Sequence, residues 1–289
     1  MEPLPETRAG ILFFVPHADD LEFGPVLTCI EALRQGHEVT EVLMTNCAYG
    51  TLNVPFRGKR LMRIRMNELE KTRDVYMAET GNVLHVKRMG HVDGFLPLSG
   101  ESISQVRELM KQLQPEIVFA PDPWFSIDYH PDHINTGRIP LLAIHGMPEH
   151  HRPRKIYLYY TFKPNTFIPC SKKNLDVAFK ALSKHRSQVS PLQIKLLRPL
   201  KWILMKVNRI RYGRHVERVR AVKPGKIREA VHPGKHGIKD AMLFSLFLKF
   251  MKPLPPERYQ PRPSELGLQI DRGAISSWEK RHATGSSRF

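Results

Sequence analysis

The 289-residue sequence is poor in cysteine and has no long hydrophobic run. Its three cysteines, Cys29, Cys47 and Cys170, form no close pair, so we expect buried thiols in a reducing compartment rather than disulfides. No stretch reaches the roughly 18 uncharged apolar residues that a spanning helix needs. The first residues, MEPLPETRAG, lack the apolar region of a secretory signal. We therefore expect a cytoplasmic protein that is at most peripheral to a membrane.

The net positive charge of the chain comes entirely from its C-terminal part. Residues 1–183 hold 21 Lys and Arg and 21 Asp and Glu, so their formal charge is zero. Residues 184–289 hold 24 basic and 7 acidic residues, which accounts for the whole net charge of +17. This asymmetry fits an anionic partner, such as a membrane surface, nucleic acid or a phosphorylated substrate, and it equally fits a solvated basic surface.

Apolar runs alternate with amphipathic stretches over most of the chain. The runs predict strands at 11–15, 38–44, 83–86, 116–120 and 155–160, and helical spacing predicts helices at 22–34, 61–80, 101–113 and 171–185. Strands separated by helices imply right-handed crossovers. We therefore expect an α/β fold with a Rossmann-like, mostly parallel sheet, helices on both faces and the strand order 3-2-1-4-5.

The alternation ends near residue 190. We assign residues 1–190 to the core and residues 191–289 to a basic C-terminal extension. Within the extension, 191–207 resembles a basic amphipathic helix, and 241–251 is apolar but too short to span a bilayer. A Pro-rich stretch at 253–263 is expected to be extended, and the last residues are expected to form a flexible tail.

Two clusters of His and Asp follow predicted strands. They are His17, Asp19 and Asp20 in PHADDLEFG, and Asp128, His130, Asp132 and His133 in DYHPDHINTG. In open α/β sheets, ligands bind outside the carboxyl ends of the strands, where the strand order reverses. The first and fourth strands are neighbours in the expected order, so the two clusters should meet at one crevice.

The residue types in these clusters are those of a zinc site. Three protein ligands from His and carboxylate, with one open position, are typical of catalytic zinc. His17 and Asp20 can converge on one ion, and His133 can supply the third ligand, which leaves a carboxylate to act as a base. Taken singly, each cluster has a simpler explanation, because Asp often caps a helix and His-Pro-Asp is common in loops. The expected cofactor is one Zn²⁺ per chain, with another divalent metal as the alternative.

These motifs resemble those of the LmbE-like (PIG-L) superfamily of zinc-dependent de-N-acetylases, which carries an HPDD-type motif after the first strand and a later HPDH motif. The resemblance covers about residues 10–190 and continues, in the family's order, through RIRMNE (Arg65, Glu68), GHVDG (Asp93) and KHRSQ at 184–188. The GRHVERV stretch around Glu217 is a further candidate.

The sequence departs from the family pattern at three positions. Ala18 stands where the family usually has Pro, and Cys170 stands where an Asp is common. Asp128 occupies the place of an active-site tyrosine in some members, and Tyr129 lies one residue away. The resemblance therefore leaves open whether Asp128 or Tyr129 takes that place.

The resemblance implies a role for each matched residue. His17, Asp20 and His133 would bind zinc, and Asp19 would be the general base. His130 would stabilise the oxyanion or protonate the leaving amine, and Asp132 would orient His130 or a ligand. Arg65 and Asp93 would face the sugar.

The implied reaction is hydrolysis of an N-acetyl group from an N-acetylglucosamine-containing conjugate by metal-activated water. One alternative is a zinc amidase acting on a different acyl group, and another is a non-catalytic Rossmann-like module that binds an anionic partner. The expected partners are a small N-acetylated sugar conjugate and, through the basic extension, an anionic membrane surface. Nucleic acid is not expected, and a homo-oligomer stays open.

Overall fold

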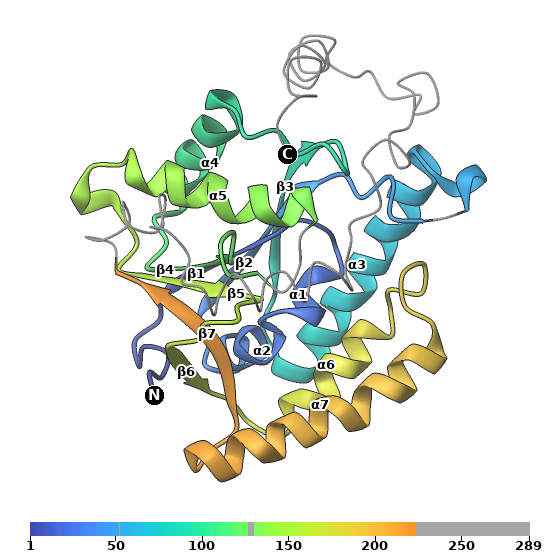
Figure 1. Cartoon of the computed structure of the whole chain (residues 1–289), viewed down its shortest axis with the longest axis vertical. Coiled ribbons are helices and arrows are strands. Elements are labelled where there is room, and N and C mark those ends of the chain that lie inside the picture. Colours follow the sequence, from blue (N-terminus) through green and yellow to red (C-terminus); the bar gives the residue numbers. More distant parts are fainter. Residues whose placement is uncertain (52, 127–129, 224–289) are drawn as a thin grey trace, which may run out of the picture.

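The computed structural model describes residues 1–51, 53–126 and 130–223 (Figure 1). Its strands are β1 (Gly10–Val15), β2 (Glu38–Thr45), β3 (His85–His91), β4 (Ile117–Pro121), β5 (Lys155–Tyr159), β6 (Thr166–Pro169) and β7 (Val216–Val222). Its α-helices are α1 (Asp20–Phe23), α2 (Val26–Arg34), α3 (Lys59–Thr80), α4 (Gly100–Leu113), α5 (Pro131–His145), α6 (Asn174–Leu182) and α7 (Pro191–Tyr212). Short 3₁₀ helices cover Val54–Phe56 and Glu149–His151.

The strands form a seven-stranded sheet in the order β3-β2-β1-β4-β5-β7-β6. The pairs β2–β3, β1–β2, β1–β4 and β4–β5 are all parallel, which confirms the predicted order 3-2-1-4-5. β7 runs antiparallel to both β5 and β6, so the complete sheet is mixed. The predicted α/β fold is confirmed.

Helices cover both faces of the sheet because the central strands are apolar on both sides (Figure 1). Along β1, Ile11 and Phe13 pack in the core cluster shared with α2, α3 and α6. Leu12 and Phe14 point the other way, into the cluster shared with α4 and α5. The alternation follows from the two-residue period of a strand. β1 is thus a rigid, fully enclosed support for the residues that follow it.

The predicted helix at 22–34 is wrong in one respect, because the chain forms two helices there. α1 ends at Phe23 and α2 begins at Val26, with Gly24 and Pro25 between them. Pro25 has no N–H to donate, and its ring would clash with the carbonyl of Leu21 in a continuous helix. As a result, the single turn that carries Asp20 is separated from α2.

The sequence pattern did not predict β6 and β7. β7 lies between β5 and β6, so residues 216–222 belong to the sheet although they lie beyond residue 190. α7 extends the predicted helix at 191–207 to residue 212. The segments 241–251 and 253–263 and the tail lie outside the described residues, so the division into core and extension stays a prediction. None of the helices in the described ranges is both long and apolar enough to cross a bilayer.

The ends of β1 and β4 are brought together with the start of α5. β1 and β4 pair directly, from Ile11–Ile117 to Phe13–Phe119. α5 then packs tightly against the end of β4 at Gly137, where a Cβ atom would lie 2.3 Å from the carbonyl oxygen of Pro121. Only glycine permits this approach, which holds the HPDH motif at the edge of the sheet.

Glu217 of β7 caps α2, which has no cap of its own. The N-cap position is Pro25, which makes no side-chain hydrogen bond. The carboxylate of Glu217 accepts hydrogen bonds from the backbone N–H of Thr28 at 2.8 Å and of Leu27 at 3.3 Å. Burial raises the pKa of Glu217, and the contacts with Thr28 and Lys201 oppose this shift. The residue in the GRHVERV motif therefore joins β7 to α2.

We expect Glu217→Ala to lower the free energy of unfolding by about 1–2 kcal/mol, because the two N–H groups lose their acceptor. Urea denaturation measures this change. Glu38→Ala, at an exposed position at the start of β2, is the matched control and should be close to neutral. Equal midpoints for the two variants would contradict the capping role.

Candidate metal centre

Three donor atoms from the two predicted clusters face one another at the edge of the sheet. His17 follows β1, Asp20 begins α1, and His133 lies in the first turn of α5. Asp20 Oδ2 lies 3.0 Å from His17 Nδ1 and 3.4 Å from His133 Nε2. The two ring nitrogens lie 3.3 Å apart. All three residues are buried.

This triangle has the size of one face of a tetrahedral metal site. With ligand bonds of about 2.1 Å, the donor atoms of a tetrahedral zinc site lie about 3.4 Å apart. The backbone N–H of His17 also donates to Asp20 Oδ2 at 2.9 Å, which holds the carboxylate toward the imidazole. The residues present therefore fit a divalent cation, with three protein ligands.

Two further carboxylates fix the orientation of His17. Its Nε2 atom lies 3.0 Å from Asp93 Oδ1 and 3.3 Å from Asp132 Oδ2. A proton on Nε2 is held by these carboxylates, which leaves the lone pair on Nδ1, the nitrogen that faces Asp20 and His133. A ligand imidazole that donates its second N–H to a carboxylate is the usual arrangement around protein metals.

Backbone amides hold these supporting carboxylates in place. Asp132 accepts hydrogen bonds from the N–H of Gly94 at 2.6 Å and of Leu96 at 3.0 Å. Asp93 accepts one from the N–H of Tyr49 at 2.6 Å. Asp93, expected to face a sugar, is thus buried against His17. Asp132 was expected to orient His130 or a ligand, and its carboxylate contacts His17, one of the three donors of the triangle.

The electrostatics of the cluster favour a positive charge at His17. Burial lowers the pKa of His17, but the carboxylates of Asp93 and Asp132 raise it. Asp20 adds to their effect, so the pKa lies well above its ordinary value. Carboxylates gathered in a buried place need a compensating cation, either a proton or a metal ion.

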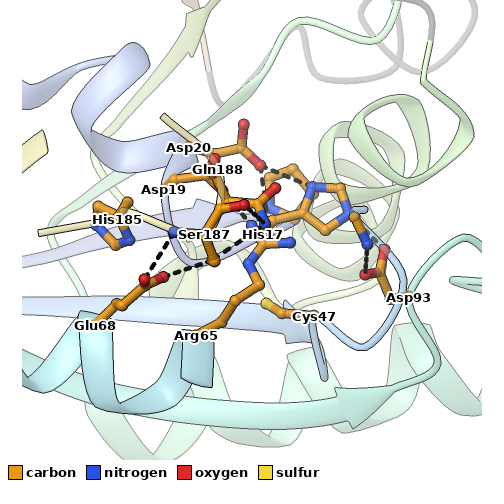
Figure 2. A network of polar contacts seen from close by, with 12 residues as sticks. His17, Asp19, Asp20, Cys47, Arg65, Glu68, Asp93, His185, Ser187 and Gln188 are labelled. Carbon is orange, nitrogen blue, oxygen red and sulfur yellow. Dashed lines mark hydrogen bonds and ion pairs between the residues drawn. The ribbon is translucent and has the colours of Figure 1, made fainter. Parts of the chain in front are cut away.

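Asp19 is not one of the three donors, and its carboxylate pairs with Arg65 of α3 (Figure 2). It occupies the N-cap position of α1 but makes no capping hydrogen bond. The explanation of Asp19 as a simple helix cap is therefore wrong. Arg65 is 2% exposed, and Asp19 compensates the charge of its guanidinium. The structure thus brings Arg65 to the carboxylate of Asp19.

His130 is the N-cap residue of α5 and completes a group of three imidazoles. Its Nδ1 accepts a hydrogen bond from the backbone N–H of Asp132 at 3.2 Å, and Pro131 occupies the first helical position, where no N–H is needed. The ring centroids of His17, His130 and His133 lie 5.2–5.3 Å apart. Burial and the neighbouring His17 lower the pKa of His130.

α3 connects the supporting motifs behind the cluster. Glu68, one turn after Arg65, accepts hydrogen bonds from Ser187 N at 2.8 Å and Ser187 Oγ at 2.6 Å (Figure 2). His185 lies 3.2 Å from the buried carboxylate of Glu22, which belongs to α1. The RIRMNE and KHRSQ motifs therefore hold α3 and the segment after α6 against the metal-binding turn.

Sequence reasoning missed Tyr160, which follows β5 at the same edge of the sheet. Its ring stacks on His133 with centroids 6.0 Å apart, and its hydroxyl donates to the backbone oxygen of Asp20 at 3.2 Å. Its φ of 57° is unusual for an aromatic residue. The position at the carboxyl end of a central strand was the available signal. Asp128 and Tyr129 lie outside the described residues.

None of the three cysteines is a donor of the metal-binding triangle, although Cys47 lies beside Ala18 and near Arg65 (Figure 2). Burial raises the pKa of Cys47 to about 11, so it remains a thiol at neutral pH. Cys170, at the family's Asp position, donates to the carbonyl of Ile168 at 3.2 Å. All three cysteines are free, and Cys29 and Cys47 are buried.

Comparison with known proteins points to one family. Residues 12–144 match the profile described as PIG-L, GlcNAc-PI de-N-acetylase. The chain is 28% identical over 238 residues to a diacetylchitobiose deacetylase from Thermococcus kodakarensis, with 78% of this chain and 86% of that protein covered.

Solved structures share the fold over most of the chain. An N,N'-diacetylchitobiose deacetylase from Pyrococcus horikoshii, complexed with an inhibitor, has a TM-score of 0.66 and 27% identity, covering 75% of this chain and 84% of its own. The 4-carboxy-2-hydroxymuconate hydratase GalB of Pseudomonas putida has a TM-score of 0.59 at 12% identity, covering 75% and 96%. The fold alone therefore does not determine the reaction, which has to be inferred from the residues of the site.

Proposed function

We propose that this chain, whose residues 12–144 match the PIG-L profile, is a zinc-dependent hydrolase that removes the N-acetyl group from an N-acetylglucosamine-containing conjugate. The observation that carries this proposal is the donor triangle of His17, Asp20 and His133 beside an unligated carboxylate, Asp19. A metal site beside an unligated carboxylate suits the hydrolysis of an amide. This reaction needs a nucleophilic water molecule and a group that accepts the proton of that water.

The three donors would hold one divalent cation, and zinc suits a set of two imidazoles and one carboxylate. Such an ion lowers the pKa of a water molecule from 15.7 to about 7 and polarises a carbonyl group. Asp93 and Asp132 would keep His17 in the tautomer that binds metal through Nδ1.

Asp19 is the proposed general base. Its carboxylate takes a proton from the attacking water and later delivers it to the departing amine. The hydrogen bond from Arg65 fixes one oxygen of this carboxylate and so sets the direction of the other. The resemblance assigned Arg65 and Asp93 to the sugar, whereas their contacts favour action through Asp19 and His17.

His130 is the proposed partner of the substrate carbonyl. Since its Nδ1 accepts the N–H of Asp132, the neutral ring carries its hydrogen on Nε2. That N–H can donate to the carbonyl oxygen as negative charge develops there, which is the effect of an oxyanion hole.

The decisive experiment combines metal analysis with product detection. We expect the purified full chain to contain about one equivalent of zinc and to release acetate and free amine in equal amounts from N,N'-diacetylchitobiose or a related N-acetylglucosamine conjugate. Chelation should abolish the activity, and added zinc should restore it. The metal content is measured by mass spectrometry, and the amine by a fluorogenic label.

Two results would replace this proposal. Amine released only from N-propionyl or longer acyl analogues would indicate an amidase of different acyl specificity. A chain that binds no divalent ion and releases no amine from any conjugate would be a non-catalytic module. We further propose a cytoplasmic location, which the three free cysteines support.

A further inference from the structure

α7 has two apolar faces, and only one of them packs against the protein. Met205 is buried in the core, and Ile194 and Leu197 pack against the same cluster. These residues recur at helical spacing and define the inner face. In Figure 1, α7 lies at the outer edge of the molecule beside α6, so its other side faces away from the core.

The outer side of α7 carries a continuous apolar row, here called the outer stripe. Its members follow one another at three- or four-residue intervals, which places them on one side of the helix. They are Leu192, Leu196, Leu200, Ile203, Val207 and Ile210, and they are 51–86% exposed. Eight of the twelve exposed large hydrophobic side chains among the described residues lie on this one helix. Such a concentration marks an interaction surface.

Positive charge accompanies the outer stripe. α7 contains six basic residues and no acidic one. Lys195, Lys206, Arg209 and Arg211 are exposed, whereas Arg198 pairs with Asp176 of α6 and Lys201 lies on the inner face near Glu217. The ammonium of Lys206 lies 3.8 Å from the ring centre of the exposed Trp202. A Trp at the border between an apolar row and a basic row is typical of a helix at a membrane interface.

The exposed surface of α7 combines positive charge with an apolar row, and this combination favours one kind of binding partner over the others. A second copy of the chain would bring two basic helices together, each with the exposed cations Lys195, Lys206, Arg209 and Arg211, which opposes dimerisation. A nucleic acid would neutralise the cations, but its phosphates would leave the apolar row in water. An anionic lipid surface accommodates both, because acyl chains cover the stripe and headgroups pair with the Lys and Arg side chains.

We propose that the outer stripe of α7 docks this protein onto the surface of a membrane that contains anionic phospholipids. The 22 residues of the helix span about 33 Å, and the helix lies in the plane of the interface with the protein above it. The catalytic proposal is independent of this one, because no residue of α7 belongs to the metal centre.

The test is flotation of the full chain with vesicles of 70% phosphatidylcholine and 30% phosphatidylglycerol, and with pure phosphatidylcholine. We expect binding to the anionic vesicles that weakens as salt is raised. Combining Leu196→Gln, Ile203→Gln and Val207→Gln should reduce binding at least about tenfold. Combining Lys195→Gln, Lys206→Gln and Arg209→Gln should weaken it about fivefold per charge.

Controls separate docking from folding. Met77→Gln with Val83→Gln removes two exposed apolar side chains outside α7 and should leave binding unchanged. All variants should keep the thermal midpoint of the parent and its zinc content, since the altered side chains are exposed. Undiminished binding by the stripe variant would assign binding to another part of the chain and overturn the proposal. Absence of binding, or a dimer that the stripe variant dissociates, would also overturn it.

Discussion

Asp19→Asn is expected to reduce the rate of acetate release by about 10²–10⁴-fold while the zinc content stays unchanged. Asparagine has nearly the same shape and keeps an oxygen that can accept from Arg65, but it cannot take a proton from water. The side chain of Asp19 lies outside the donor triangle, and the triangle is complete without it. The rate and the metal content are measured on the same preparation.

Asp74→Asn is the matched control, because it makes the same change at an exposed position of α3. It should leave the rate unchanged. Loss of zinc from Asp19→Asn would make Asp19 a ligand, and a rate within twofold of the parent would exclude it as the base. Arg65→Lys adds a further check, since a shorter reach from α3 should lower kcat more than it raises KM if Arg65 acts by orienting Asp19.

The sequence was sufficient to predict how the two clusters meet. β1 and β4 are apolar throughout, and their neighbour relationship follows from the connections of a doubly wound sheet. With that topology, His17 and Asp20 must lie near His133. The prediction worked because each step used a local pattern, either a buried strand or the polar residues at its carboxyl end.

Other features depend on contacts that no local pattern reveals. β7 reads VERVRAV, a charged stretch that becomes a strand because β5 and β6 lie on either side of it. Glu217 matched a motif, but its role as a cap depends on α2, which lies about 190 residues earlier in the chain. In both cases the interacting elements are far apart in the sequence, so their contact depends on the tertiary fold and cannot be predicted from local spacing.

Arg65 and Asp93 show the same limit at the site. An Arg on an amphipathic helix suggests a surface or ligand contact, but its burial against Asp19 becomes visible only when α3 packs beside the first turn after β1. Asp93 follows β3, yet its partner is the far nitrogen of His17. Residues that orient others depend on orientation in three dimensions, which a sequence motif does not encode.

His133→Ala is expected to abolish stoichiometric zinc binding and, with it, the activity. The variant removes one corner of a triangle whose edges are 3.0–3.4 Å, leaving His17 and Asp20 with open coordination positions. Asp93→Asn should have a smaller effect, about 10–100-fold in zinc affinity, because it removes only the support of a ligand. Competition with a chromogenic chelator measures both affinities. Zinc should also raise the thermal midpoint of the parent but not of His133→Ala.

The control for this variant lies on the same helix. His145 occupies the last turn of α5 and is exposed, so His145→Ala should keep both the zinc content and the zinc-dependent rise in the midpoint. If His133→Ala bound zinc as tightly as His145→Ala, the ion would be held elsewhere. The geometry predicts an order of zinc affinities: His133→Ala binds zinc most weakly, Asp93→Asn is intermediate, and His145→Ala binds it like the parent. This order distinguishes a ligand from a residue that supports a ligand. It does so through affinity alone, without reference to any substrate.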